Sequence, residues 1–104
     1  MATFLLVYHG GSMPETPEEN AQVMAAWNAW MGTLGERLVD AGNPVSQVKT
    51  VAADGSVSDG GTNPSTGYSI IKADNIDAAV ALAKGCPVLQ GGASVEVAET
   101  LDVM

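Results

Sequence analysis

The first apolar segment of the chain constrains its fold more than any other feature. Residues 4–8 read FLLVY, so apolar side chains occupy both faces of an extended strand over residues 3–9. A strand with one wet face alternates apolar and polar residues, whereas a strand covered on both faces does not. The pattern predicts a central strand that is buried on both sides and ends at Gly10 and Gly11.

A long amphipathic helix is expected next. Thr16, Pro17 and Glu19 are typical of a helix start, because they supply a capping hydroxyl, a proline at the first helical position and the glutamate of a capping box. Apolar residues then recur every three or four positions, which predicts a helix from about Pro17 to Ala41 that ends at Gly42. The apolar stripe consists of Val23, Trp27, Trp30, Leu34 and Leu38.

Strand and helix signals alternate along the rest of the chain. Asp54-Gly55 is a strong hairpin signal, so residues 45–53 and 56–58 are expected to pair across it. Residues 59–66 are expected to form a loop. The remaining expected elements are a strand over 67–73, a helix over 75–84 capped by Asp74, and a strand over 94–99.

The order strand-helix-strand-strand-helix-strand is the ferredoxin-like plan, an α+β fold in which two helices cover one face of a four-stranded antiparallel sheet. The 104 residues are expected to form one domain, residues 1–104. Because the first strand is apolar on both sides, the sheet face without helices needs a cover. A second copy of the chain is the simplest cover, so we expect a homodimer closed through the open sheet faces.

Composition excludes several kinds of partner. Acidic residues outnumber basic ones 12 to 4, and the net charge is −8. Nucleic acids need clustered Lys and Arg, so no nucleic acid partner is expected, and an anionic membrane surface is disfavoured for the same reason. With one cysteine, Cys86, and one histidine, His9, we expect no internal disulfide, no metal and no cofactor. No signal-peptide core or membrane-spanning run stands out, and the expected location is the cytoplasm.

The order and spacing of several segments resemble the YCII-related proteins, in particular the branch with a DGPF motif. The resemblance covers nearly the whole chain and implies a dimeric α/β barrel. The matching segments are FLLVY at 4–8, DAG at 40–42, DGSVSDG at 54–60, GYSII at 67–71, DNIDAA at 74–79, Cys86-Pro87, and GASVEV at 92–97.

The chain departs from this family at two places. The DGPF motif survives only as Asp59 and Gly60, because Gly61 and Thr62 stand where the branch has Pro and Phe. The founding branch has a proposed His–Asp pair, with the His on the first helix and the Asp before a proline. Here the first helix has no histidine and Cys86 precedes that proline. The activity proposed from that pair is therefore not carried over.

His9 and Asp59 are the candidate catalytic residues. His9 ends the first strand beside two glycines, and histidine suits acid–base chemistry near neutral pH. If the loop after Asp59 folds over the end of that strand, Asp59 would orient His9. Each residue also has a structural interpretation: a strand-end histidine that hydrogen-bonds a loop, and a turn aspartate that binds its own backbone.

Four aromatic residues are candidate ligand-binding residues. Trp27 and Trp30 lie three apart on the first helix, where they would either line a cleft between helix and sheet or fill the core. Tyr8 and Tyr68 lie on strands and are expected to face the interior of the dimer. A buried tyrosine hydroxyl needs a partner, which a bound ligand could supply.

Two functions fit these residues. The first is a dimeric small-molecule-binding module without catalysis. The alternative is a small-molecule enzyme that transfers protons on a carbonyl or lactone-like substrate, as an isomerase or hydrolase does, with His9 as acid–base and Asp59 as the orienting carboxylate. One histidine and a broken motif form a small catalytic set, which favours the first.

Overall fold

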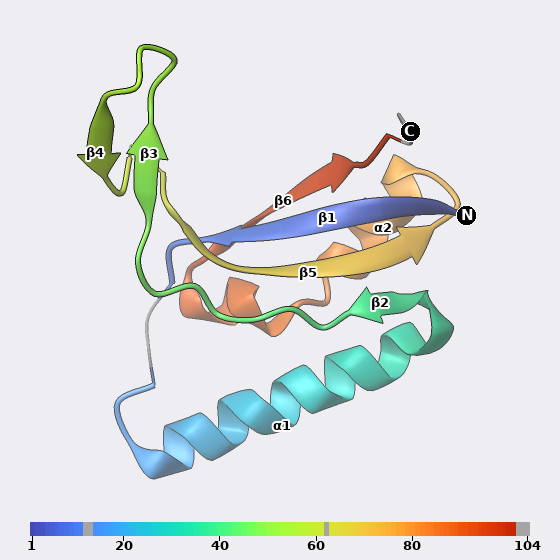
Figure 1. Ribbon diagram of the computed structural model, residues 1–104. Helices are drawn as coiled ribbons and strands as arrows, with labels where there is room; N and C mark the ends of the chain where they lie inside the picture. The colour runs from blue at the N-terminus through green and yellow to red at the C-terminus, as the bar shows by residue number, and fades with distance from the viewer. Residues whose placement is uncertain (12–13, 62, 102–104) are drawn as a thin grey trace.

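The computed structural model describes residues 1–11, 14–61 and 63–101. The main sheet has the expected order strand-helix-strand-strand-helix-strand, but its second strand comes from residues 38–40, which were expected to be helical. The strand expected over residues 45–53 lies outside the main sheet and contributes only residues 49–51 to a separate hairpin (Figure 1). The elements are β1 (Ala2–His9), α1 (Pro17–Leu34), the 3-10 helix η1 (Gly35–Arg37), β2 (Leu38–Asp40), β3 (Lys49–Val51), β4 (Val57–Asp59), β5 (Ser65–Ala73), α2 (Ile76–Ala83), the 3-10 helix η2 (Pro87–Gly91) and β6 (Ser94–Glu99).

The main sheet has the strand order β2-β5-β1-β6, and all its neighbours are antiparallel. Both α-helices contribute to the hydrophobic core on one side of it. This arrangement confirms the α+β class and the ferredoxin-like fold. As expected, β1 is a central strand, flanked by β5 and β6. The separate pair β3–β4 forms a small second sheet.

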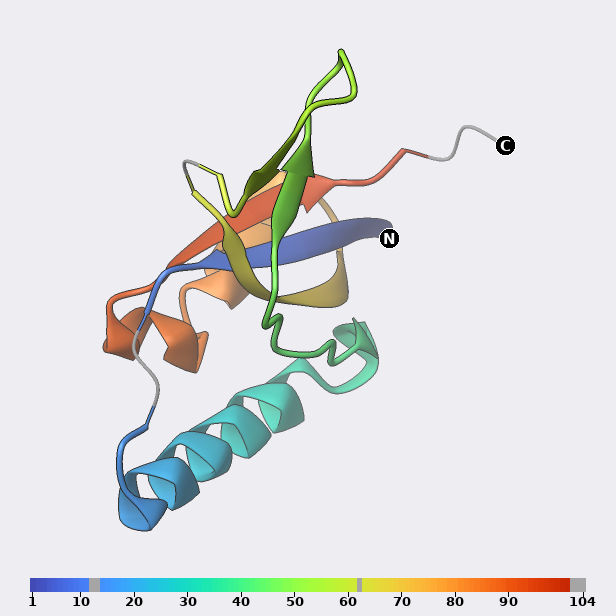
Figure 2. The same ribbon diagram turned by 60° about the vertical axis from the view of Figure 1, so that its left-hand side comes forward.

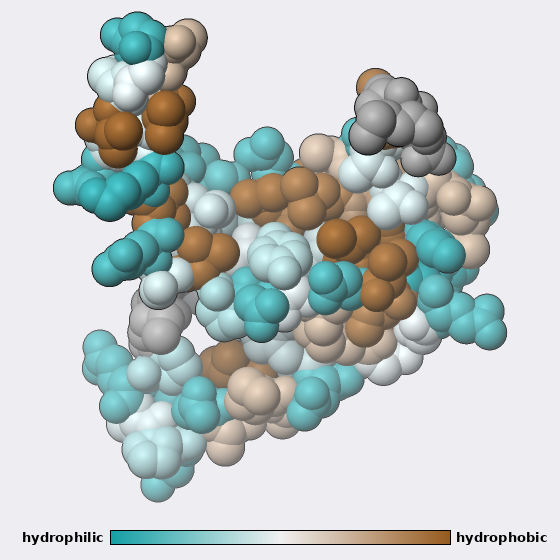
Figure 3. Space-filling view, viewed as in Figure 1, coloured by the Kyte–Doolittle hydropathy of each residue, from teal (hydrophilic) through white to brown (hydrophobic). Residues whose placement is uncertain are grey.

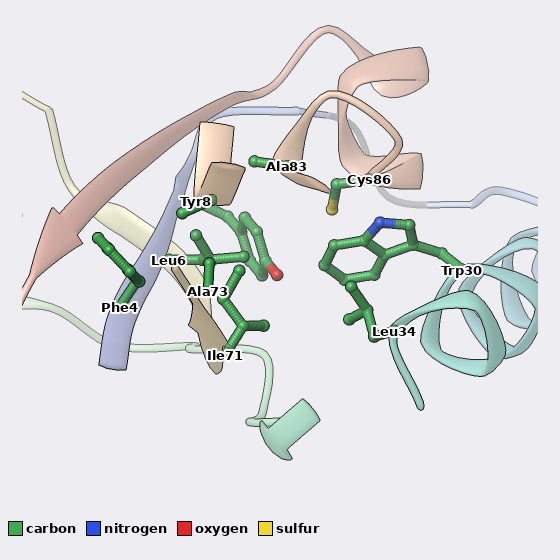
Figure 4. Close-up of a cluster of buried hydrophobic side chains, with 10 residues drawn as sticks. Phe4, Leu6, Tyr8, Trp30, Leu34, Ile71, Ala73, Ala83 and Cys86 are labelled. Atoms are coloured by element: carbon green, nitrogen blue, oxygen red, sulfur yellow. The ribbon is translucent and has the colours of Figure 1, made fainter. Parts of the chain in front are cut away.

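The two faces of β1 have different surroundings. Phe4, Leu6 and Tyr8 point toward the helices and are buried in the core (Figure 4). Leu5 and Val7 point to the opposite face and are only half-buried. The sequence predicted that β1 is buried on both faces. In the single chain only the face toward the helices is fully buried, and the apolar side chains on the other face remain partly in solvent.

The first helix is shorter than predicted. It begins at Pro17, and the hydroxyl of Thr16 caps it by accepting a hydrogen bond from Glu19 N at 3.1 Å, as expected. It ends at Leu34 and not at Ala41, because Gly35 adopts a positive φ of 55° and its N–H donates to the carbonyl of Met31.

After Gly35 the chain changes direction and joins the sheet as β2. Leu38, which the apolar stripe placed on the helix, lies on β2 opposite Ile71. Gly42 has a positive φ of 78° and passes so close to β5 that an added Cβ would lie 1.7 Å from the carbonyl oxygen of Tyr68. The glycine expected to end the helix therefore allows the chain to turn tightly against the sheet.

The remaining elements follow the sequence with small corrections. The predicted hairpin forms around Asp54-Gly55, with shorter strands than expected. The cap of α2 is Asn75 and not Asp74, because the Asn75 side chain accepts from Ala78 N at 2.8 Å. In the described part of the chain, no helix is both long enough and apolar enough to span a membrane.

The hairpin β3–β4 projects beyond the end of the main sheet (Figures 1 and 2). The radius of gyration is 15.0 Å, whereas a compact chain of this length has about 13 Å. The single chain is therefore more extended than an isolated globular domain of its size.

Candidate functional site

The sheet face that carries no helix has a group of apolar side chains at its centre. Leu5 lies opposite Ile70 and Ala98, and Val7 lies opposite Tyr68. All five side chains are half-buried. Figure 3 shows apolar surface spread over the strands on this side of the molecule. We call this surface the open face.

His9 lies at one end of the open face, where β1 ends. Its Nε2 lies 3.0 Å from Oε1 of Glu96 on β6, and its Nδ1 lies 3.3 Å from the carbonyl oxygen of Pro64. The His9 side chain is 11% exposed, whereas that of Glu96 is 64% exposed. The imidazole is therefore held between two segments that lie far from it in the sequence.

Both groups that hold His9 are hydrogen-bond acceptors. A neutral imidazole has one N–H and donates one hydrogen bond, while an imidazolium donates two. The ring therefore satisfies Glu96 and Pro64 together only when both nitrogens carry a proton. A carboxylate beside a histidine also orients the ring, which is the arrangement that general acid–base chemistry uses.

Asp59 does not pair with His9. It lies at the end of β4, where its Oδ1 accepts from Lys49 Nζ at 2.8 Å, and both side chains are exposed. The carboxylate beside His9 is that of Glu96. The expected contact between His9 and Asp59 is therefore wrong, and Glu96 takes the place of Asp59. The signal that identifies Glu96 is the fold itself, because the ferredoxin-like order pairs the last strand with the first.

Tyr8, Trp27 and Trp30 lie together on the helix side of the sheet. Their rings pack edge to face, with centroids 5.5 Å apart for Tyr8–Trp27 and 5.6 Å for Trp27–Trp30. Tyr8 donates to Ser69 Oγ at 2.7 Å, and Trp30 Nε1 donates to the carbonyl of Leu82 at 3.1 Å. The hydroxyl and the indole nitrogen thus have partners inside the protein, as in a packed core.

Tyr68 is the one aromatic candidate on the open face. Strand alternation places it on the same side as Val7, and its hydroxyl accepts from Asn43 Nδ2 at 3.5 Å. Tyr8 faces the opposite side, so the two tyrosines do not share a surface. Of the four residues expected to bind a ligand, Tyr8, Trp27 and Trp30 therefore belong to the core, and only Tyr68 lies on the open face with His9.

Cys86 and Tyr8 are buried neighbours in the core (Figure 4). Burial raises the pKa of the Cys86 thiol, although hydrogen bonds with the Val88 backbone and the Tyr8 side chain oppose the change. Burial likewise raises the pKa of Tyr8, and its hydrogen bond with Ser69 opposes this. Both groups are protonated near neutral pH, so Cys86 offers no thiolate nucleophile.

Two surface hollows lie away from His9. One, of about 310 Å³, lies at the base of the hairpin and is lined by Gln47, Val48, Lys49 and Asp59. The other, of about 330 Å³, is an open groove between α2, η2 and β6, lined by Val80, Ala83, Lys84, Leu89, Val95 and Val97. Among the described residues, no group of three or more His, Cys, Asp or Glu side chains could hold a metal ion.

Comparison with known proteins supports the fold. No protein-family model matches the chain, and no curated protein matches it. Among solved structures, the chain is similar to 5-chloro-2-hydroxyhydroquinone dehydrochlorinase (TftG) from Burkholderia phenoliruptrix AC1100, in complex with 2,5-dihydroxybenzoquinone. The TM-score is 0.56 and the sequence identity 17%, over 95% of this chain and 93% of that chain. At this identity the two proteins share a fold, and the agreement extends over almost their full lengths.

Proposed function

We propose that this protein is a small-molecule-binding protein whose site lies at the His9 end of the open face and is enclosed when two copies pack face to face. The observation that carries the proposal is the position of His9. It is a polar, largely buried side chain beside the apolar side chains at the centre of the open face. Small-molecule sites combine an apolar lining with a few fixed polar groups in this way.

A second copy would supply the missing wall. Leu5, Val7 and Ile70 remain half-buried in the single chain, and sheets that pack face to face bury such side chains between them. Self-association of a chain with a net charge of −8 also needs a contact surface without excess negative charge. The open face carries few charged side chains, with Lys72 on the same side as Glu96 and Asp40, so most of the excess negative charge lies elsewhere on the molecule.

The proposed ligand class is a small planar molecule with hydroxyl or carbonyl groups. Tyr68 offers an aromatic surface and a hydroxyl, while His9 and Glu96 offer a proton donor and acceptors. The structural neighbour was solved with such a molecule, 2,5-dihydroxybenzoquinone. We also infer membership of the YCII-related family, which the shared fold supports and which implies a dimeric barrel.

The single histidine makes the test direct, because its ring signals in an NMR spectrum report on one site only. We would titrate the protein with 2,5-dihydroxybenzoquinone and with a panel of small phenols, hydroxyketones and lactones. The proposal predicts saturable shifts of the His9 signals, with little change at the indole N–H of Trp30 in the core. Shifts centred on Trp30, or no saturable shift from any compound in the panel, would contradict it.

Proton transfer is a second candidate function, favoured by the 3.0 Å contact between His9 and Glu96. In this case His9 exchanges a proton with a carbonyl or lactone-like substrate, and Glu96 orients the ring. His9→Gln would then abolish turnover of any substrate found in the panel. Glu96→Gln, which keeps a hydrogen-bond acceptor beside the ring, would retain part of it. Turnover that survives His9→Gln unchanged would exclude this function.

A further inference from the structure

The hairpin of residues 49–59, which we call the arm, lacks the support that a surface hairpin normally has. Isolated two-stranded hairpins are marginally stable in water and need further strands or a packed surface. The arm extends past the end of the main sheet, away from the side covered by α1 and α2 (Figures 1 and 2). Every residue from Lys49 to Asp59 is exposed.

One face of the arm is apolar at its centre. Val51 and Val57 are directly opposed in the β3–β4 ladder, so their side chains lie on the same face, and they are 67% and 61% exposed. The Lys49–Asp59 ion pair lies two residues further along the same face. The other face carries Thr50 and Ser58, which are polar.

This face suits contact with another copy of the same acidic chain. The ion pair neutralises Lys49 and Asp59 on this face, the remaining charge of the arm, Asp54, lies in the turn at its tip, and the molecule as a whole carries −8. Two such molecules repel each other at most other surfaces, so a neutral and apolar face is a place where they can meet. The elongated shape of the single chain agrees with an arm that completes its packing elsewhere.

We propose that the arm is a dimerisation element whose Val51–Val57 face packs against the second copy bound at the open face. The inference rests on the dimer of the proposed function and adds a second contact region to it. Because the dimer is symmetric, each copy extends one arm and receives one. Contacts outside the sheet faces would lengthen the lifetime of the dimer, and with it the time for which the site at His9 stays closed.

The test compares two substitutions that add the same charge at adjacent positions on opposite faces of the arm. Val57→Asp places a carboxylate in the proposed contact, and Ser58→Asp places one on the polar face. Sedimentation equilibrium would measure the dimer dissociation constant of each variant and of the unmodified chain. We expect Val57→Asp to raise the constant at least tenfold and Ser58→Asp to change it less than threefold.

Hydrogen exchange on the unmodified chain provides an independent readout. The backbone amides of residues 49–59 should become more protected as protein concentration rises through the dissociation constant. If the chain is a dimer but the two variants dissociate alike and the arm amides show no such protection, the role of the arm is wrong and the dimer stands. If the unmodified chain is monomeric at every concentration, both the arm contact and the enclosed site are wrong.

Discussion

At the scale of single residues, the buried polar side chains of the described core have hydrogen-bond partners inside the protein. Ser69 is fully buried and accepts from the hydroxyl of Tyr8 while donating to the carbonyl of Ala41, both at 2.7 Å. One hydroxyl thus links the central strand, its neighbour and the turn after β2. Removing it would leave a buried tyrosine hydroxyl without an acceptor.

We therefore expect Ser69→Ala to lower the free energy of unfolding by about 1–3 kcal/mol, the usual cost of leaving a buried polar group unpaired. Urea titration followed by tryptophan fluorescence would measure it. Ser58→Ala is the matched control, because Ser58 is an exposed serine on a strand and should change stability by less than about 0.5 kcal/mol. Equal effects of the two substitutions would contradict the role of Ser69.

Alkaline pH should destabilise the fold through Cys86 and Tyr8. Burial raises the pKa of both groups in the folded chain, so the unfolded chain loses these protons first as pH rises. The stabilisation is complete below the ordinary thiol pKa of about 8.5 and is lost progressively above it. The free energy of unfolding should therefore be smaller near about pH 10 than near about pH 7, and Cys86→Ala should reduce the difference. An unchanged slope in Cys86→Ala would show that the thiol does not contribute.

At the scale of elements, glycines decide where the helix ends and where the chain can turn. Gly32 lies in the last turn of α1 with open space around its missing Cβ, whereas Gly42 has a positive φ and lies against the backbone of Tyr68. The same substitution at the two positions should therefore have opposite effects.

Gly32→Ala should stabilise the protein by about 0.5–1 kcal/mol, because alanine favours helical backbone and loses less backbone entropy on folding. Gly42→Ala should destabilise it by at least about 2 kcal/mol, because a side chain needs both a strained backbone and a displaced β5. Thermal unfolding of both variants would measure these effects. A stable Gly42→Ala variant would mean that the turn against Tyr68 is not tight.

The helix end also illustrates what the sequence does not determine. Thr16, Pro17 and Glu19 define the start of α1 because capping chemistry is local. The end is ambiguous because Gly35 and Gly42 are both suitable stop residues, and the apolar spacing continues past the first of them to Leu38. Only the pairing of Leu38 with Ile71 resolves the choice, and this contact joins residues far apart in the chain.

The candidate site was predicted in part for the same reason. Alternation along residues 94–99 places Glu96 on the polar side of its strand, but strand pairing and register bring it to His9. Asp59 attracted attention as the retained part of a motif, yet its nearest charge is Lys49, across the hairpin. Local patterns proposed His9 and Tyr68 as candidates, while the partners of His9 depended on tertiary structure.

At the scale of the whole molecule, the account depends on whether the open face is covered. A single chain buries one side of β1 and leaves Leu5, Val7 and Ile70 partly in solvent on the other. A face-to-face dimer buries them and encloses the His9 end of the sheet at the same time. On the proposed function, association and ligand binding both depend on this surface.

Sedimentation equilibrium of the unmodified chain, of Ile70→Lys and of Val80→Lys tests this claim most directly. Ile70 lies on the open face, and Val80 is an exposed apolar residue on α2. We expect twice the chain mass of 10.6 kDa for the unmodified protein and for Val80→Lys, and a folded monomer for Ile70→Lys. A mass of 10.6 kDa for the unmodified chain throughout the micromolar range, or a dimer that Ile70→Lys leaves intact, would contradict it.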